Sequence, residues 1–265
     1  MATYLDRILA AHRATAAIDR RDLDALTAQA RSSGPVRGFT AALRAQDGVA
    51  VIAEVKRASP SKGPLFPDLD PALIATAYQE GGAAALSVLT DHEFFRGSPE
   101  DLVAARAATA LPVLRKDFTV SQADVLDARC MGADAVLLIT AALLPREISQ
   151  LLRVAASVGL DVLVEVHDET EAALALGAGA TLIGVNQRDL STFDVDPKRA
   201  VRVARMLPAG VTRVAESGIR NSDDVRRLAG AGFDAVLVGE ALVCSPHPAA
   251  ALRQLRRGAA LPTRR

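Results

Sequence analysis

A repeated pattern of short apolar runs separated by helical segments constrains the fold of this chain more than any single residue does. Continuous runs of Val, Ile, Leu and Ala, without polar alternation, are typical of parallel strands buried on both faces. From residue 49 onward there are eight such runs, at residues 49–55, 84–89, 112–114, 134–139, 161–166, 181–185, 212–215 and 234–238. The pattern predicts eight strands, each followed by a helix.

The segments between the runs carry helix start and stop signals. Residue types preferred at helix N-caps, most of them followed by Pro, occur at Asp70, Ser98, Asp196 and Asn221. Glycines lie where the helices should end, at Gly81, Gly132, Gly159, Gly177 and Gly230. Eight such units over about 210 residues fit a (β/α)8 TIM barrel, which takes about 200 to 250 residues. The alternative is an open doubly wound sheet, which the absence of Gly-x-Gly-x-x-Gly after the first run disfavours.

The chain divides into three expected parts. Residues 1–45 precede the first run, and Leu5, Ile8 and Leu9 indicate an amphipathic helix there. We expect this N-terminal helical extension to pack on a catalytic barrel of residues 46–257, followed by a C-terminal tail of residues 258–265.

Composition excludes several function classes. The net charge is zero, aromatic residues make up 3% and Trp is absent, which disfavours nucleic-acid binding. The longest uncharged apolar stretch, residues 135–144, is too short to span a membrane. Charged residues among the first thirteen disfavour a secretory signal, and Cys130 and Cys244 match no metal or redox spacing. We therefore expect free thiols and a cytoplasmic location.

Lysine is rare in this chain and unevenly placed. Of 31 basic residues only four are lysines, and two of them, Lys56 and Lys116, lie where apolar runs end. Each has an arginine beside it, Arg57 and Arg115 respectively, so positive charge alone was already available. A partly desolvated ammonium can give up a proton, whereas a guanidinium stays charged. The placement favours proton chemistry; the alternative is a codon bias that left these two lysines by chance.

Further polar residues follow the predicted strands, where TIM barrels build their active sites. Glu54 lies two residues before Lys56 and should point to the same side. Taken singly, each of these residues is explained by a surface position just past a strand. Taken together, they favour one active site. They are Glu54, Lys56, Lys116, Glu165, Asn186, Arg188, Glu216 and Ser217.

Glycines after the last two runs indicate a phosphate site. Gly218 follows the seventh run, and Gly239 and Glu240 follow the eighth, where barrels bind phosphate through loop N–H groups. Ser59 and Pro60, after the first run, should lie near the same mouth. The four histidines share no ligand spacing, so we predict no metal.

Several ordered motifs closely resemble those of the indole-3-glycerol phosphate synthase family. The longest is Ile52-Ala-Glu-Val-Lys-Arg-Ala-Ser-Pro-Ser-Lys-Gly63. The others are Leu114-Arg-Lys-Asp-Phe118, Leu163-Val-Glu-Val-His167, Ile183-Gly-Val-Asn-Gln-Arg-Asp-Leu190, Val214-Ala-Glu-Ser-Gly-Ile219 and the segment 89–98. The likeness runs from about residue 51 to residue 240. One departure is Gln187, where the family often has a second Asn.

The resemblance implies a cofactor-free lyase of tryptophan biosynthesis. Such a decarboxylase converts 1-(2-carboxyphenylamino)-1-deoxyribulose 5-phosphate into indole-3-glycerol phosphate, carbon dioxide and water. By analogy Lys116 is the first acid and Glu165 the base. Lys56, oriented by Glu54, holds the substrate carboxylate and is also a candidate acid for the dehydration. Which lysine protonates which oxygen stays open. The resemblance is also compatible with association with other tryptophan-pathway enzymes.

The analogy also assigns the residues that bind the phosphosugar. Asn186, Glu216 and Ser217 would position the sugar hydroxyls and the intermediate, and Arg188 and Glu240 also lie at strand ends. A phosphate cradle is expected from Ser59, Gly218 and Gly239. The apolar bed for the aromatic ring is expected from Pro60, Phe94 or Phe95, Phe118 and Leu190.

Two alternatives remain on sequence grounds. One is a neighbouring phosphosugar enzyme, such as phosphoribosylanthranilate isomerase or an enzyme that forms a Schiff base on lysine. The other is a catalytically silent barrel that serves as a scaffold or regulator. A silent barrel predicts lost polar groups at the strand ends, and none is lost here.

Overall fold

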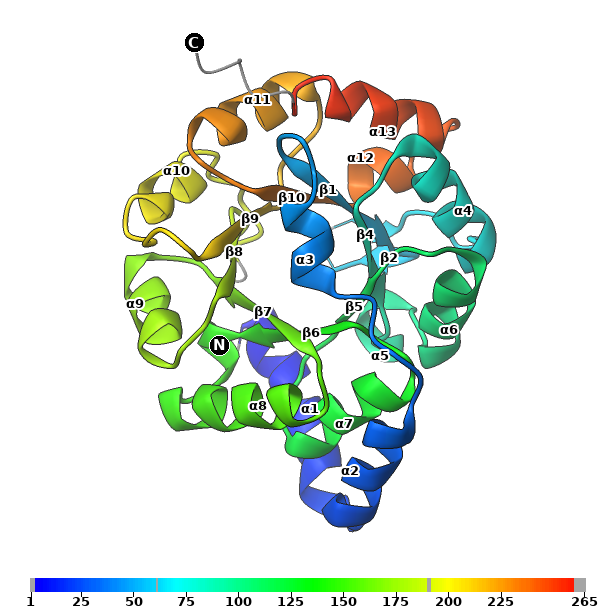
Figure 1. Ribbon diagram of the computed structural model, residues 1–265, viewed down its shortest axis with the longest axis vertical. Helices are drawn as coiled ribbons and strands as arrows, with labels where there is room; N and C mark the ends of the chain where they lie inside the picture. The colour runs from blue at the N-terminus through cyan, green and yellow to red at the C-terminus, as the bar shows by residue number, and fades with distance from the viewer. Residues whose placement is uncertain (1–2, 61, 190–191, 260–265) are drawn as a thin grey trace.

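The chain forms a closed barrel of eight parallel strands, seen in the computed structural model for residues 3–60, 62–189 and 192–259 (Figure 1). Each strand pairs with the next in chain order and the last pairs with the first, so the sheet has no open edge. The strands are β1 (Ala50–Val55), β4 (Ala85–Leu89), β5 (Val113–Lys116), β6 (Ala135–Ile139), β7 (Asp161–Val166), β8 (Leu182–Asn186), β9 (Thr212–Glu216) and β10 (Ala235–Val238). The predicted (β/α)8 barrel is confirmed, and every predicted run is a strand.

Helices surround the barrel, one after each strand (Figure 1). They are α4 (Pro71–Gly81), α6 (Pro99–Ala108), α7 (Gln122–Cys130), α8 (Pro145–Ser157), α9 (Glu169–Gly177), α10 (Arg199–Ala204), α11 (Ser222–Gly230) and α13 (Pro248–Arg256). Shorter elements lie in the loops that follow strands, namely the hairpin β2 (Ala58–Ser59) and β3 (Gly63–Pro64), the helices α5 (His92–Phe95) and α12 (Glu240–Val243), and the 3₁₀ turn Thr140–Ala142.

The helix boundaries follow the predicted caps with one exception. Asp70, Ser98 and Asn221 accept hydrogen bonds from the first turns of α4, α6 and α11. Asp196 does not cap α10, because its carboxylate closes a separate turn onto the backbone N–H of Lys198, and the helix starts only at Arg199.

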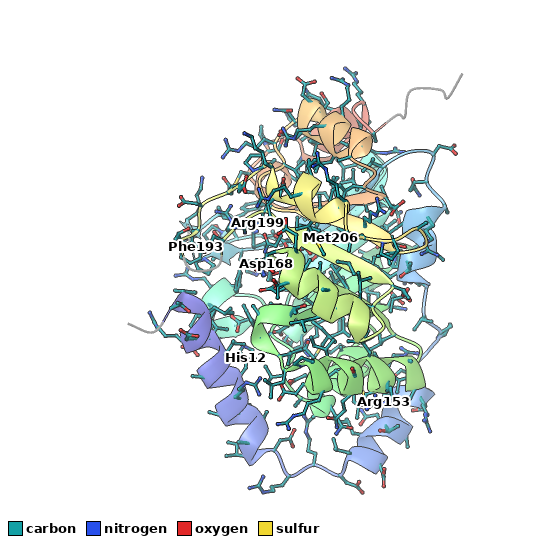
Figure 2. The ribbon with its side chains drawn as sticks, turned by 90° about the vertical axis from the view of Figure 1, so that its left-hand side faces the viewer. His12, Arg153, Asp168, Phe193, Arg199 and Met206 are labelled. Carbon is teal, nitrogen blue, oxygen red and sulfur yellow. The ribbon has the colours of Figure 1, made fainter. Side chains whose placement is uncertain are left out.

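The N-terminal segment forms three helices that reach both ends of the barrel. They are α1 (Tyr4–Ile18), α2 (Leu23–Ser32) and α3 (Phe39–Arg44). In Figure 1, α3 crosses the centre of the barrel, at the end where the strands begin. In Figure 2, α1 lies on the same side of the molecule as the loop residue Phe193.

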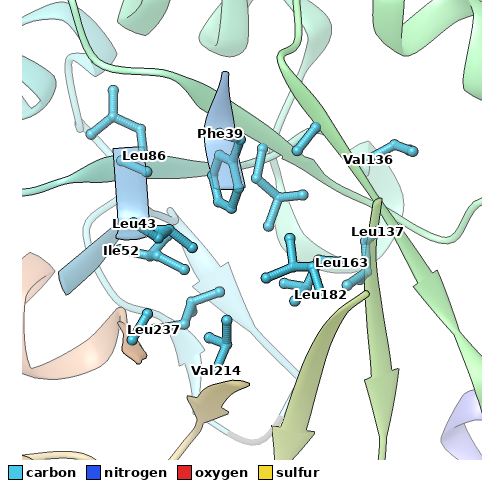
Figure 3. Close-up of a cluster of buried hydrophobic side chains, with 14 of the residues drawn as sticks. Phe39, Leu43, Ile52, Leu86, Val136, Leu137, Leu163, Leu182, Val214 and Leu237 are labelled. Atoms are coloured by element: carbon cyan, nitrogen blue, oxygen red, sulfur yellow. The ribbon is translucent and has the colours of Figure 1, made fainter. Parts of the chain in front are cut away.

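Helix α3 fills the amino end of the barrel core. Phe39 and Leu43 are buried and point into the ring of strands, toward Ile52 and Leu86 (Figure 3). This packing explains the apolar runs within the strands, since one face meets the barrel interior and the other meets the helices.

Polar contacts at the strand starts hold this segment in place. The backbone N–H of Arg37 donates to Asp134 at 2.7 Å, and that of Thr40 donates to Asp161 at 2.8 Å. The guanidinium of Arg44 donates to the hydroxyl of Thr212 at 2.7 Å.

Two smaller expectations concern helices and thiols. In the described ranges, every helix is either too short or too polar to cross a bilayer. Cys130 and Cys244 are both free thiols, as predicted.

Candidate active site

A cavity of about 420 Å³ opens at the carboxyl ends of the strands. Almost all predicted site residues line it together, although they come from seven strands and the loops that follow them. They are Glu54, Lys56, Ser59, Pro60, Phe95, Lys116, Phe118, Glu165, Asn186, Arg188, Glu216, Ser217, Gly218, Gly239 and Glu240. Two predicted residues are absent from this lining: Phe94, which lies beside it, and Leu190, which lies outside the described residues.

Lys116 lies between two carboxyl groups. Its Nζ is 3.2 Å from Oε2 of Glu165 and 4.0 Å from Oε2 of Glu216. Burial opposes the charged form of Lys116, but Glu165, Glu216 and Glu54 outweigh that effect and raise its pKa above the ordinary value. Without a ligand, Lys116 is therefore a protonated ammonium that can act as an acid.

Glu165 is the most heavily supported carboxylate in the site. Its side chain is 1% exposed, and it accepts a hydrogen bond from Asn186 at 3.1 Å in addition to the contact with Lys116. Burial would raise its pKa, but Lys116, His167 and Asn186 together lower it below the ordinary value. Glu165 is thus ionised and held in one orientation.

His167 supplies a second cation on the far side of Glu165. Its Nε2 is 3.3 Å from Oε1 of Glu165, and its Nδ1 is 3.0 Å from Oε2 of Glu171. Burial lowers the pKa of His167, yet the two glutamates raise it to about 10. The sequence analysis assigned His167 no role, whereas the structure makes it an imidazolium that orients Glu165.

Glu216 differs from Glu165 although the two are neighbours. Burial first, and then the charge of Glu165, raise the pKa of Glu216 to about 8. Its Oε1 has no hydrogen-bond partner within the described part of the chain. Gly184 makes room for this carboxyl, because a Cβ at that position would overlap Oε1. Glu216 therefore presents a protonated carboxyl to the cavity at neutral pH.

Lys56 forms a second lysine–carboxylate pair on β1. Its Nζ donates to Oε1 of Glu54 at 2.5 Å, and the side chain is 16% exposed. Gly239 leaves space for this pair, since a Cβ there would lie 3.0 Å from Nζ and would overlap the Glu54 carboxylate. The two ammonium groups of the site thus each have a carboxylate partner.

The arginines beside the two lysines face away from the cavity. Arg57 makes two hydrogen bonds to Asp101 of α6, at 3.1 and 2.8 Å. Arg115 donates to Thr90 at 3.1 Å and to Asp117 at 2.8 Å. On β5, consecutive residues point to opposite sides, so Lys116 reaches the cavity while Arg115 binds the outer layer. Just after β1, Lys56 likewise lines the cavity while Arg57 does not.

The loop after β9 turns sharply where it borders the cavity. Ser217 and Gly218 both have positive φ, 63° and 71°, so their backbone turns sharply at the cavity. The buried side chain of Gln187 donates from Nε2 to the carbonyl of Ser217 at 2.7 Å and supports this turn. Such turns can direct backbone N–H groups toward a phosphate.

Arg188 and the rim residues complete the polar side of the cavity. Arg188 donates its backbone N–H to Oδ1 of Asn186 at 3.0 Å and its Nη1 to the carbonyl of Phe193 at 2.9 Å. Lys62 pairs with Glu240 at 2.9 Å, and both side chains are about half exposed. Positive charge is therefore available at the entrance.

Aromatic rings form the opposite wall. The rings of Phe95 and Phe118 lie 6.1 Å apart and both line the cavity. Phe94 packs edge-on against Tyr4, with ring centroids 5.8 Å apart, and Tyr4 contacts Phe193 in the same way at 5.7 Å. Of the two phenylalanines predicted as alternatives, Phe95 lines the cavity and Phe94 does not.

The sequence analysis missed several residues that line the cavity. They are Tyr4, Leu5, Ile8, Leu89, Ile139, Phe193, Ile219, Arg220, Leu237, Val238, Ala241 and Cys244. The apolar face of α1 was visible in the sequence, but periodicity does not tell at which end of the barrel a helix docks. The local pattern around Phe193 and Arg220 carried no signal that separates cavity residues from ordinary loop residues.

Comparisons of the sequence with known proteins all point to the same family. A model of the indole-3-glycerol phosphate synthase family matches residues 5–255. A protein named indole-3-glycerol phosphate synthase from Chlorobium luteolum is 50% identical over 246 residues, which cover 92% of this chain and 94% of that protein. Another of that name from Mycolicibacterium smegmatis is 50% identical over 256 residues, covering 96% and 94% respectively.

A third similar protein is indole-3-glycerol phosphate synthase 2 of Streptomyces coelicolor, 51% identical over 230 residues that cover 87% of this chain and 89% of that one. Among solved structures, thiamine phosphate pyrophosphorylase from Pyrococcus furiosus superposes with a TM-score of 0.62 at 20% identity, covering 80% of this chain and 96% of that one. At that identity the likeness concerns the barrel fold alone.

Proposed function

The chain belongs to the indole-3-glycerol phosphate synthase family, and from this premise we propose how its residues divide the work of the reaction. The enzyme is a carboxy-lyase of tryptophan biosynthesis. It converts 1-(2-carboxyphenylamino)-1-deoxyribulose 5-phosphate into indole-3-glycerol phosphate, carbon dioxide and water by ring closure, decarboxylation and dehydration.

The observation that carries the proposal is Lys116 between Glu165 and Glu216, inside a cavity large enough for a phosphosugar. In ring closure, the carboxyl-bearing carbon of the aromatic ring attacks the ketone, and the ketone oxygen must receive a proton. Lys116 supplies that proton as a general acid. After carbon dioxide leaves, Lys56 protonates the new hydroxyl, which departs as water, and Glu165 acts as the base that removes a proton from the neighbouring CH2 carbon.

The acid and the base are coupled through their charges. Lys116 is one of the groups that lower the pKa of Glu165 in the resting site. When Lys116 gives its proton to the substrate, that cation is lost and the basicity of Glu165 rises. The carboxylate is therefore weakly basic before ring closure and becomes a stronger base when dehydration requires one.

The remaining site residues hold the substrate. Lys56 binds the substrate carboxylate and Glu54 keeps the ammonium oriented, as their 2.5 Å contact supports. Asn186, Glu216 and Ser217 bind the sugar hydroxyls and the intermediate.

The phosphate and the aromatic ring occupy separate parts of the cavity. The backbone around Gly218 and Gly239, with Ser59, cradles the phosphate. Phe95, Phe118 and Pro60 form the bed for the aromatic ring, and Arg188 and Glu240 complete the polar part of the lining.

Three broader proposals accompany these roles. Residues 1–45 act as an extension on a catalytic barrel of residues 46–257, with residues 258–265 as a tail. A cytoplasmic location is supported by the free thiols Cys130 and Cys244. The enzyme uses no cofactor and binds neither nucleic acid nor membrane, and association with other tryptophan-pathway enzymes stays a prediction.

Indole fluorescence tests the function directly. The protein has no Trp, so its own emission leaves the indole signal clear. When pure protein is mixed with 1-(2-carboxyphenylamino)-1-deoxyribulose 5-phosphate, indole emission should appear. The amount of indole product that it measures should equal the amount of carbon dioxide released. Lys116→Met should abolish both, whereas Lys198→Met, at an exposed lysine outside the cavity, should change neither.

Two outcomes would contradict the assignment. Unchanged substrate after prolonged incubation would overturn the synthase activity. A borohydride-trappable adduct on Lys56 or Lys116 would instead favour a Schiff-base mechanism over the acid–base mechanism proposed here.

A further inference from the structure

A buried charge cluster joins helix α1 to the aromatic wall of the cavity. Nε2 of His12 lies 2.9 Å from Oδ2 of Asp91 and 4.0 Å from Oδ1 of Asp117. The side chains of both aspartates are 4% exposed, and that of His12 is 22% exposed. None of these three residues has a role in the mechanism above.

We propose that His12 is a positioning residue, a cationic clasp that holds α1 over the substrate cavity through Asp91 and Asp117. The inference rests on the proposed function, because it concerns how the same cavity binds its substrate. His12 touches no reacting atom and acts only through the helix that carries it and the two aspartates.

Helix α1 carries the clasp and the cavity wall on one face. Tyr4, Ile8 and His12 are spaced four residues apart, so they lie one above another along the helix. Tyr4, Leu5 and Ile8 line the cavity, and Ile8 is the buried residue of α1. Holding the helix at His12 therefore fixes the position of its cavity-lining turn.

The aspartates connect the clasp to the aromatic wall. Oδ1 of Asp91 accepts the backbone N–H groups of Phe94 and Phe95 at 2.7 and 3.1 Å, and so caps α5. The ring of Phe118 lies 5.4 Å from the imidazole of His12. Phe95 and Phe118 both line the cavity, so displacement of His12 would disturb two of its walls.

Charge balance favours a proton on His12 rather than a metal ion in the cluster. Each carboxylate already has protein partners, since Asp117 accepts from Arg115 at 2.8 Å and from its neighbour Phe118 N–H at 2.8 Å. Two aspartates and one arginine leave one negative charge, which a single imidazolium neutralises. The adjacent guanidinium of Arg115 would repel a divalent cation.

The surroundings of His12 stabilise its charged form. Burial lowers its pKa, but Asp91, Asp117 and Asp124 of α7 outweigh burial and raise it above 6.5. For Asp91, burial acts in the other direction and raises the pKa. His12 and the hydrogen bonds of the helix cap outweigh burial and bring the pKa of Asp91 below its ordinary value. Arg115 on β5 is the opposing cation, and on α1 itself Arg13 turns away to Glu147.

The pH dependence of the clasp follows from these directions. The contribution of His12 is complete below 6.5, the value for a detached histidine, and is lost as pH rises through its raised pKa. The contribution of Asp91 is present above its ordinary value of 3.8 and is lost as pH falls through its lowered pKa. The clasp is therefore closed in mildly acidic solution and weakens as pH rises through the raised pKa of His12.

Steady-state kinetics of His12→Gln and His12→Lys test the clasp. At pH about 6.5, His12→Gln should raise KM about tenfold and change kcat less than about twofold, because binding is affected and chemistry is not. His12→Lys keeps a cation and should restore most of the affinity. His247→Gln, at an exposed histidine of the α13 cap, is the matched control and should match the parent.

The pH profile separates the clasp from a merely structural role. The ratio of KM in His12→Gln to KM in the parent should fall toward one as pH rises above the pKa of His12. Titration of Glu216 affects both proteins equally and cancels in this ratio. A ratio that stays constant with pH, or a KM equal to that of the parent at every pH, would overturn the proposal.

Hydrogen exchange provides a readout that needs no catalysis. Backbone amides of residues 4–18 should exchange faster in His12→Gln, while amides of β1 and β5 keep the rates of the parent. Equal exchange of α1 in both proteins would refute the clasp even if the enzyme is active. An inactive parent with a pH-dependent α1 would instead refute the synthase function and leave the clasp standing.

Discussion

Adjacent residues at this site differ in the side to which their side chains point as well as in their chemistry. Lys116 faces Glu165 and Glu216, while Arg115 beside it binds Thr90 and Asp117. The rarity of lysine was a reason to suspect proton chemistry here, and a codon bias was the competing explanation. The geometry supplies what composition lacked, because it shows which of the two adjacent cations meets the cavity.

Replacement of Lys116 by Arg is the sharpest test at this scale. The guanidinium keeps the charge but does not release a proton at working pH, so kcat should fall by about 10² to 10⁴, the usual contribution of a general acid. The measurement is steady-state turnover by indole fluorescence. Arg115→Lys should reduce kcat only slightly, although loss of its forked hydrogen bonds should lower the melting temperature. Near-normal turnover by Lys116→Arg would exclude it as the proton donor.

Replacement of Glu216 by Gln should raise the stability of the protein and lower its activity. Its folded pKa of about 8 lies above the ordinary value of 4.5, so across this window the unfolded chain loses a proton that the folded enzyme keeps. Stability therefore declines as pH rises from 4.5 to about 8 and then levels off. Glu216→Gln removes this penalty.

The expected result is a melting temperature of Glu216→Gln that exceeds that of the parent increasingly as pH rises through this window, with a lower kcat. Thermal unfolding followed by circular dichroism at several pH values measures it. A difference between the two proteins that does not vary with pH would argue against a protonated Glu216.

Sequence reasoning worked at residue scale where a residue follows a strand, and failed where it does not. Glu54, Glu165 and Asn186 were found because barrel sites form at strand ends. His167 was given no role because its position two residues after Glu165, which places it on the same side, fits a structural or solvent-facing histidine equally well. Tyr4 lies 112 positions before Lys116 (116 − 4 = 112), and no local pattern brings such distant residues into one cavity.

Among the elements, the strands were the easiest to predict and α3 was the hardest. Continuous apolar runs bounded by glycine identified every barrel strand. Helix α3 has only six residues, too few for a helical period to stand out, and its role depends on the barrel that it closes. The cap expected at Asp196 was wrong for a similar reason, since a turn competed locally with the helix start.

Phe39 tests how much α3 contributes to the core. Its side chain is fully buried at the amino end of the barrel, so Phe39→Ala should lower the free energy of unfolding by about 3 to 5 kcal/mol. Urea unfolding measures this value, and kcat of the folded variant should stay unchanged because the cavity is at the opposite end. Leu73→Ala, at a side chain 71% exposed on α4, is the control and should change stability by less than about 0.5 kcal/mol. Equal losses in the two variants would contradict a core role for α3.

At the scale of the whole molecule, the N-terminal segment serves the two ends of the barrel in different ways. Helix α1 lines the substrate cavity, whereas α3 fills the core. Near the strand starts, α3 binds Asp161 and Thr212, and the segment just before it binds Asp134. One continuous segment therefore contributes to binding at one end and to stability at the other.

Two truncations should separate these contributions. Removal of residues 2–20 should leave a cooperatively unfolding protein with weakened substrate binding. Removal of residues 2–45 should expose the amino end of the core and leave buried carboxylates without partners, so cooperative unfolding should be lost. Thermal denaturation and KM of both proteins are the measurements. A fragment that lacks residues 2–45 and melts like the full chain would show that α3 is dispensable.

The opposite orientations of Arg115 and Lys116 also affect which mutations the gene can tolerate. Lys116 pairs in register with Leu89, and Arg115 with Val88. Deletion or insertion of one residue within β5 would exchange the two cations while leaving the overall charge unchanged and the composition nearly so. Such an enzyme would present a guanidinium to the substrate and bury an ammonium in the outer layer. The side of the sheet that each cation faces thus depends on its odd or even position along the strand. Natural selection should therefore tolerate insertions and deletions in the surrounding loops and remove those within β5.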